Sequence, residues 1–99
     1  MTMLEEQPVS RADLRVRDPF ILPDPATGTY YLCTSLRAAE GRPRHGVGVY
    51  TSHDLETWHG PVRVFETPAD FWAQGPIWAP EMHRYGGRTY LFLTFSTDD

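Results

Sequence analysis

The sequence predicts an all-β fold, because short runs of aromatic and β-branched residues alternate with turn residues along nearly the whole chain. Three tryptophans, five tyrosines and five phenylalanines occur in 99 residues, together with nine prolines and eight glycines. Helical periodicity is weak, and the one helix candidate, residues 10–14, is too short to be stable by itself. A chain of this length forms at most one small domain.

Five runs have the composition of strands, in chain order residues 20–22, 29–35, 46–51, 62–65 and 88–96. The first run is followed by a turn over residues 23–28, which holds two prolines and a glycine. A His-Gly-Pro turn at residues 59–61 precedes the fourth run, and a proline-rich loop precedes the last. Each run is thus delimited by residues that favour turns.

A short pattern occurs twice, as Thr-Tyr-x-Leu-x-Thr from Thr29 and as Thr-Tyr-x-Phe-x-Thr from Thr89. Each copy follows a glycine-containing turn and a segment of the type Xaa-Pro-Xaa. One period holds about four strands, and four-stranded repeats of ~40–50 residues are typical of β-propeller blades. Chance similarity between two strands is the alternative. A propeller needs ~4–8 blades, so these residues would supply only one blade and the opening of a second.

Charge and composition exclude several classes of function. Nine arginines and no lysine stand against thirteen acidic residues, a net charge of −4, which argues against a nucleic-acid-binding surface. The single cysteine, Cys33, excludes an internal disulfide and a multi-cysteine zinc site. No apolar stretch approaches the ~20 residues that span a bilayer. The first eight residues do not resemble a secretory signal, so we expect a cytoplasmic protein.

Asp18 is the first candidate functional residue. In an extended segment, Leu14, Val16, Asp18 and Phe20 would share one face, and Pro19 biases Asp18 away from the helical region. A carboxylate on an apolar face is costly unless it is paired or used in function. Asp18 is therefore either a functional carboxylate or a structural residue that caps the turn or pairs with Arg17 at an edge.

A second candidate region lies in the proline-rich loop, where Trp72 and Trp78 are six residues apart. Flat aromatic faces beside carboxylates and amides suit a sugar, whose C–H faces are apolar and whose hydroxyl groups need hydrogen-bond partners. The alternative is that at least one tryptophan belongs to the core. Glu81 has the same ambiguity, either as a substrate ligand or as a partner of Arg84.

Three other groups of residues are expected to be structural. The segment from Ser52 to Trp58 is typical of a turn in which Asp54 accepts backbone hydrogen bonds and the tryptophan anchors the next strand. Cys33 lies among tyrosines in a predicted strand and is expected to be buried and inert. The four histidines show no metal-binding spacing, so we expect solvated loop histidines and no metal site.

Three segments follow one another in a specific order: Arg-Asp-Pro-Phe at residues 17–20, the Ser-x-Asp-Leu…Trp turn at residues 52–58, and Trp-Ala-Pro-Glu at residues 78–81 before Gly-Gly-Arg-Thr-Tyr. Together they resemble the N-terminal part of glycoside hydrolase family 43. The resemblance covers roughly residues 16–96 and implies a five-bladed β-propeller. Residues 14–99 would form its first blade and the start of the second, after an N-terminal extension over residues 1–13.

Members of this family hydrolyse arabinofuranosides, xylosides or arabinan with inversion at the anomeric carbon. The resemblance makes Asp18 the general base that activates water. It places Trp78 and Glu81 in the central cleft, although Glu81 stands where Asp is commoner. With the aromatic residues Phe20 and Trp72, these are the substrate-binding candidates. No cofactor is implied, and a structural calcium ion is left open for the full-length protein, since this sequence shows no recognisable ligand set for it.

The family also requires an Asp that tunes the general acid and a Glu that protonates the leaving group, both in later blades beyond residue 99. We therefore expect that the 99-residue polypeptide neither folds stably nor hydrolyses glycosides by itself. Two other hypotheses remain: a non-catalytic carbohydrate-binding propeller, and a small stand-alone β domain. The expected partner is a carbohydrate, with no nucleic acid and no membrane, and the oligomeric state is left open.

Overall fold

A computed structural model describes residues 8–39 and 41–97. It contains seven strands and one short 3₁₀ helix, in the order β1 (Val9–Ser10), η2 (Arg11–Asp13), β2 (Phe20–Asp24), β3 (Thr29–Leu36), β4 (Gly46–Ser52), β5 (Thr57–Glu66), β6 (Trp78–Tyr85) and β7 (Arg88–Thr94). The predicted all-β fold is confirmed. None of the helical structure in the described part of the chain is long and apolar enough to cross a membrane.

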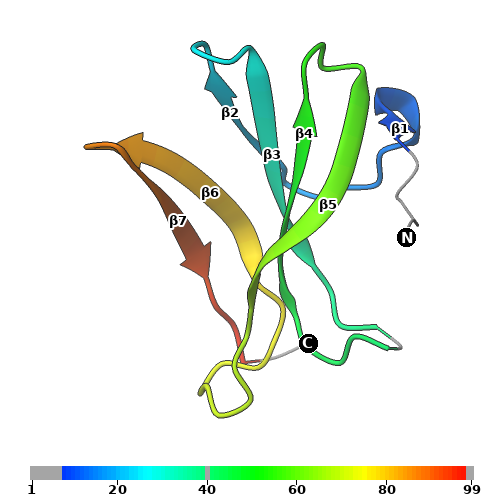
Figure 1. Ribbon diagram of the computed structural model, residues 1–99. Coiled ribbons are helices and arrows are strands. Elements are labelled where there is room, and N and C mark those ends of the chain that lie inside the picture. The colour runs from blue at the N-terminus through cyan, green and yellow to red at the C-terminus, as the bar shows by residue number, and fades with distance from the viewer. Residues whose placement is uncertain (1–7, 40, 98–99) are drawn as a thin grey trace.

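The strands form two antiparallel sheets. Strands β2 to β5 follow one another as a meander, and β1 joins the outer edge of β5, so that the order is β1-β5-β4-β3-β2. Strands β6 and β7 form a separate hairpin that lies beside β2 and β3 (Figure 1). A four-stranded meander followed by the first hairpin of the next sheet is the arrangement of one propeller blade and the start of another.

The core lies between the two sheets. Buried side chains from β3 and β4 (Cys33, Val47 and Val49) pack with Ile77, which precedes β6, and with Met82 on β6. Phe20, Leu22, Tyr31, Phe65, Leu91, Leu93 and Phe95 surround this cluster and are partly buried. Because the cluster draws on both sheets, packing fixes the position of the hairpin against the meander.

The predicted turn between β4 and β5 is confirmed. The carboxylate Oδ1 of Asp54 accepts hydrogen bonds from the backbone N–H groups of Thr57 and Glu56, each at 2.9 Å. These bonds hold the pKa of Asp54 below its ordinary value. The Ser52 hydroxyl accepts the backbone N–H of Leu55 at 2.9 Å, and Trp58 is 2% exposed. Trp58 therefore anchors the start of β5 as predicted.

Two segments predicted as loop or turn are strands. Residues 78–85 form β6 although Pro80 interrupts the sequence, because a register shift between Trp78 and Glu81 accommodates the proline at a bulge. Strand β5 likewise runs through Gly60 and Pro61 instead of starting at residue 62, and the β4–β5 register shifts there. Sequence reasoning treated proline as a strand terminator at both sites, whereas bulges absorb it.

The ends of the other elements differ slightly from the prediction. Strand β2 continues through Pro23 to Asp24, because an edge strand tolerates a residue without an N–H group. Strand β7 ends at Thr94, two residues before the predicted end. The helix candidate at residues 10–14 is a single 3₁₀ turn, and the pairing of β1 with β5 lies within the predicted extension over residues 1–13. The domain boundary at residue 14 stays a prediction.

The internal repeat corresponds to a structural repeat. Tyr30 lies opposite Pro23 in the β2–β3 hairpin, and sixty positions later Tyr90 lies opposite His83 in the β6–β7 hairpin. A residue with positive φ precedes a proline near the start of each first strand, at Asp18 (φ 48°) and Ala79 (φ 44°). The two copies of the pattern are thus the second strands of two equivalent hairpins.

A substitution at Gly46, the first residue of β4, tests how closely β4 packs on β5. A Cβ added there would collide with the carbonyl oxygen of Phe65 and with Nη1 of Arg63. We expect Gly46→Ala to lower the free energy of unfolding of the full-length protein by about 3 kcal/mol, measured by urea denaturation. Gly28→Ala is the control, because its Cβ would meet nothing within 4 Å and only its φ of +69° opposes the change, at a cost of about 1 kcal/mol. Equal losses in the two variants would contradict this packing.

Candidate active site

Asp18 lies in the connection that enters β2, immediately before Pro19. Its side chain is exposed, and its φ of 48° places the backbone in the left-handed region. The expected extended conformation at Asp18 is therefore wrong, and the predicted alternation with Leu14 and Phe20 is broken at this residue. Asp tolerates the left-handed region better than most residues. Strained backbone of this kind is concentrated at functional sites.

The backbone next to Asp18 is held from β3. The Thr34 hydroxyl, 3% exposed, donates a hydrogen bond to the carbonyl oxygen of Arg17 at 3.3 Å. No ion pair between Asp18 and Arg17 occurs in the described residues, so the edge-pair alternative finds no support in the geometry. The Asp18 carboxylate is thus a solvent-accessible group on an anchored segment.

Glu81 and His83 form a pair on β6. Oε1 of Glu81 lies 2.9 Å from Nε2 of His83, and both side chains are about half exposed (54% and 50%). Arg84 instead pairs with Asp24 at 3.4 Å, so the predicted alternative of a Glu81–Arg84 pair is wrong. Residues 81 and 83 share one face of the strand, whereas residue 84 points to the other face.

Two phenylalanines enclose the His83 ring. Its centroid lies 5.1 Å from that of Phe20 on β2 and 5.4 Å from that of Phe92 on β7. Glu81, His83 and Phe92 also line a cavity of about 420 Å³. The structure therefore brings the predicted residues Phe20 and Glu81 into one cluster, and it adds His83 and Phe92. In a strand, residues 81 and 83 share one face, so a strand over these residues would have predicted that His83 lies beside Glu81. The segment was instead predicted to be a loop.

The two predicted tryptophans lie in different surroundings. Trp78 begins β6, is 38% exposed, and lines a cavity of about 830 Å³ that Arg17 also lines. Trp72 is 70% exposed in the loop before β6, where its ring packs on Phe71 at 5.4 Å, and it lines neither this cavity nor the one at Glu81. Trp58, not either of these two, is the tryptophan of the core.

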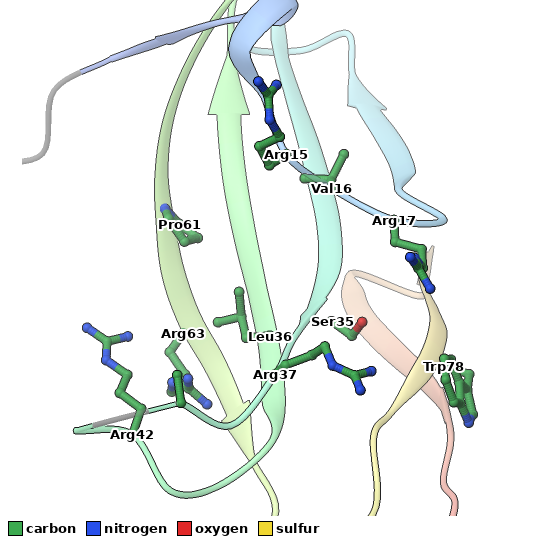
Figure 2. A pocket seen from close by; sticks show the side chains of 11 residues that line it. Arg15, Val16, Arg17, Ser35, Leu36, Arg37, Arg42, Pro61, Arg63 and Trp78 are labelled. Atoms are coloured by element: carbon green, nitrogen blue, oxygen red, sulfur yellow. The ribbon is translucent and has the colours of Figure 1, made fainter. Parts of the chain in front are cut away.

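The larger cavity is lined by five of the nine arginines, Arg15, Arg17, Arg37, Arg42 and Arg63. Arg17 and Arg37 lie on the side of Trp78, whereas Arg42 and Arg63 lie at the far side beside Leu36 and Pro61 (Figure 2). No acidic residue belongs to the lining among the described residues. The net charge of −4 gave no indication of this local concentration of positive charge, because net charge does not show where charges gather in the fold.

Cys33 is a free, fully buried cysteine, as predicted. Its thiol donates a hydrogen bond to the carbonyl oxygen of Pro80 on β6 at 3.3 Å. Burial raises the pKa of Cys33 to about 11, so the nucleophilic thiolate is scarce at neutral pH. The cysteine therefore links β3 to β6 and is not a catalytic group.

His53 is an exposed turn residue, as expected, whereas the other three histidines are not solvated loop residues. His59 and His83 lie on strands, and Nδ1 of His45 accepts the backbone N–H of Ala38 at 3.0 Å. Loop composition around them suggested solvent exposure, whereas two strands extend further than predicted. No group of three or more metal-ligating side chains occurs among residues 8–39 and 41–97.

Comparison with known proteins places this arrangement in a family. A family model described as glycosyl hydrolases family 43 matches residues 6–99. The chain belongs to this family. The crystal structure of an endo-arabinase from Bacteroides thetaiotaomicron VPI-5482 superimposes with a TM-score of 0.73 at 41% sequence identity. The match covers 93% of this chain and 30% of that chain. A search of curated proteins finds no match.

The family assignment confirms the fold that the resemblance implied. The β2–β5 meander is a propeller blade of this glycoside hydrolase family, and the β6–β7 hairpin begins the next blade. The chain spans 30% of the length of the family 43 enzyme with which it superimposes. Asp18 and Trp78 occupy similar places in the two blades. Asp18 lies just before β2, the first strand of the first blade, and Trp78 is the first residue of β6, the first strand of the second.

The buried thiol of Cys33 makes stability depend on pH in alkaline solution. The folded state keeps this proton up to a pKa of about 11, whereas the unfolded thiol loses it near 9. Raising the pH through this interval therefore favours the unfolded state. We expect the stability of the full-length protein relative to its Cys33→Ala variant to fall by up to ~1.4 kcal/mol per pH unit there, measured by urea denaturation. A pH-independent difference between the two proteins would contradict this interpretation.

Proposed function

We propose that the protein to which this chain belongs is an inverting glycoside hydrolase that cleaves arabinofuranosyl linkages in arabinan-type glycans. The observation that carries this proposal is the 41% identity with an endo-arabinase over 93% of the chain. The exposed carboxylate of Asp18 on an anchored, strained segment supports it from the geometry. Xylosyl linkages are the second substrate class, because the family resemblance covers both.

In this mechanism Asp18 acts as the general base. Its carboxylate accepts a proton from a water molecule as the water oxygen attacks the anomeric carbon. A general acid on the other side of the sugar protonates the departing glycosidic oxygen at the same time. The two carboxyl groups of inverting glycosidases lie roughly 6.5–9.5 Å apart, which leaves room for the water. A base needs solvent access of the kind that Asp18 has.

We propose that the general acid and the Asp that tunes it lie beyond residue 99, in later blades. The coverage of 30% of the endo-arabinase chain supports this division. The chain itself then contributes the base and one wall of the cleft, and the isolated 99 residues are expected to be inactive. No cofactor takes part in this mechanism, and we propose a cytoplasmic location.

The substrate contacts in this proposal come from the starts of the two blades. Trp78 offers a partly exposed aromatic face to a sugar ring. The ring centroid of Phe20 lies 5.1 Å from that of His83, and Nε2 of His83 pairs with Oε1 of Glu81. The second carboxylate oxygen of Glu81 can accept a hydrogen bond from a sugar hydroxyl. Trp72 stays a candidate for a more distant sugar unit, because it is exposed but lines neither cavity described above.

A non-catalytic carbohydrate-binding propeller is the alternative function. The partly exposed rings of Trp72 and Trp78 would serve a binding protein equally well. The alternative requires no general acid in the later blades, so the downstream sequence and the hydrolysis assay distinguish the two functions.

The role of Asp18 is tested by Asp18→Asn in the full-length protein. We expect kcat for an aryl α-L-arabinofuranoside to fall by ~10²–10⁴-fold, because the amide cannot accept the proton from water. Asp70→Asn is the matched control, since Asp70 is an exposed aspartate in the loop after β5. Activity near the wild-type level in Asp18→Asn would refute the assignment.

The stereochemistry of the reaction is a separate test. Proton NMR recorded during hydrolysis of an α-L-arabinofuranoside reports the configuration of the sugar first released. We expect the β anomer, because water activated by Asp18 attacks the face opposite to the leaving group. Initial release of the α anomer would show retention and would exclude a general-base role for Asp18.

The role of Trp78 is tested by Trp78→Ala. We expect KM for arabino-oligosaccharides to rise by about tenfold, equivalent to ~1.4 kcal/mol of lost binding, with a smaller change in kcat. Tyr85→Ala is the matched control, because Tyr85 is an exposed aromatic residue (80%) at the opposite end of β6. An unchanged KM in Trp78→Ala would remove this residue from the substrate contacts.

A further inference from the structure

We propose that the arginine-lined cavity, defined by Arg15, Arg17, Arg37, Arg42 and Arg63, binds the carboxylate of a uronic acid unit in the glycan. The binding of an anion follows from the cavity alone. The assignment of that anion to a glycan rests on the proposed function, because it assumes that a sugar chain passes this face of the protein.

The charge of the cavity is the first observation. More than half of the arginines of a chain with a net charge of −4 line one cavity of about 830 Å³. Arg17 and Arg37 have no carboxylate partner within 4.0 Å among the described residues. Like charges gathered in a concave surface repel one another and create a positive potential that attracts anions. A bound carboxylate would relieve this repulsion.

Arg63 is the second observation. Among the described residues, its buried Nη1 atom has no hydrogen-bond partner, and Oε1 of Glu66 lies 4.0 Å from it. The glycine at position 46 leaves the space that the guanidinium occupies, since a Cβ there would collide with Nη1. An unsatisfied buried donor is costly. The packing at Gly46 therefore accommodates the Arg63 guanidinium, while Nη1 has no hydrogen-bond partner among the described residues.

The chemistry of the lining favours a carboxylate on a sugar. A planar guanidinium donates two parallel N–H groups, which match the two oxygens of a carboxylate. Arg37 and Ser35 lie toward the Trp78 side of the cavity (Figure 2). Charged donors, a hydroxyl and an aromatic face thus occur together, and a uronic acid unit presents the matching carboxylate, hydroxyl groups and C–H face.

The cavity also lies close to the proposed catalytic base along the chain. Arg17 lines it and directly precedes Asp18, and Trp78 lines it at the start of the second blade. An acidic unit bound here would lie against Arg17, the residue that precedes Asp18 in the chain. The site would therefore select glycans that carry a negative charge near the bond to be cleaved.

The experiment measures binding by isothermal titration calorimetry with the full-length protein and three probes: an oligogalacturonate, the same oligomer fully methyl-esterified, and inorganic phosphate. We expect the acid to bind at least about tenfold more tightly than the ester, and this difference to shrink as salt is added. An equal affinity for acid and ester would overturn the proposal. Phosphate that binds as tightly as the oligogalacturonate would also overturn it, because the site would then serve a free inorganic anion.

Variants locate the binding site. We expect Arg37→Gln combined with Arg42→Gln to weaken binding of the oligogalacturonate by about tenfold and to leave binding of the ester unchanged. Arg88→Gln is the matched control, since Arg88 is an exposed arginine at the other end of the β6–β7 hairpin. Unchanged binding of the acid in the double variant, or an equal loss in Arg88→Gln, would overturn the proposal.

Asp18→Asn separates this proposal from the proposed function. The arginine site does not include the Asp18 carboxylate, so we expect the variant to bind the oligogalacturonate as tightly as the wild type does. If no arabinoside or xyloside is hydrolysed by the wild type while acid binding persists, the hydrolase assignment fails and the anion site stands. If the wild type hydrolyses an arabinoside or xyloside but binds the acid no better than its ester, the hydrolase assignment stands and the anion site fails.

Discussion

The buried face between the β2–β5 meander and the β6–β7 hairpin is the constraint on which the remaining structure depends. Val47 and Val49 present an apolar surface that water would otherwise cover, and Met82 from β6 closes it. Burial of apolar surface is worth roughly 25 cal/mol per Å², so this contact decides where the second blade begins. Strand β6 lies against β2 and β3. The start of β6, at Trp78, and the segment that leads into the start of β2, at Arg17, then line the same cavity.

Strand β3 fixes these two starts more closely than packing alone. Its neighbouring residues Cys33 and Thr34 donate hydrogen bonds to the carbonyl oxygens of Pro80 and Arg17, respectively. A residue of positive φ lies next to each anchored carbonyl, Ala79 in one case and Asp18 in the other. Both donors are buried, and a bond that replaces water at a buried group is strongly preferred to none. Strand β3 of the first blade thus anchors, by one hydrogen bond each, the positive-φ segments at the starts of both blades.

The sequence predicted the fold class and most strands, because alternating aromatic and β-branched residues dictate β structure locally. It also identified the Asp54 turn, whose hydrogen bonds involve residues close in the chain. It missed β6, because Pro80 resembles a terminator unless the bulge that accommodates it is known. It missed the Glu81–His83 pair for the same reason. The arginine cavity depends on residues from β3, β5 and separate loops, and no local pattern brings them together.

The contrast between net and local charge has a functional consequence. A neutral arabinan needs hydroxyl partners and aromatic faces, which Trp78 and the Glu81–His83 pair can offer. It gives no reason to bury a guanidinium donor of Arg63 that has no hydrogen-bond partner among the described residues, or to gather five arginines in a cavity whose described lining holds no acidic residue. Such an arrangement reduces stability in the absence of a ligand, because like charges repel at short range. The acidic remainder of the chain would meanwhile repel polyanions elsewhere on the surface, so a negatively charged glycan would be directed to the cavity that Arg17, the neighbour of Asp18 in the chain, helps to line.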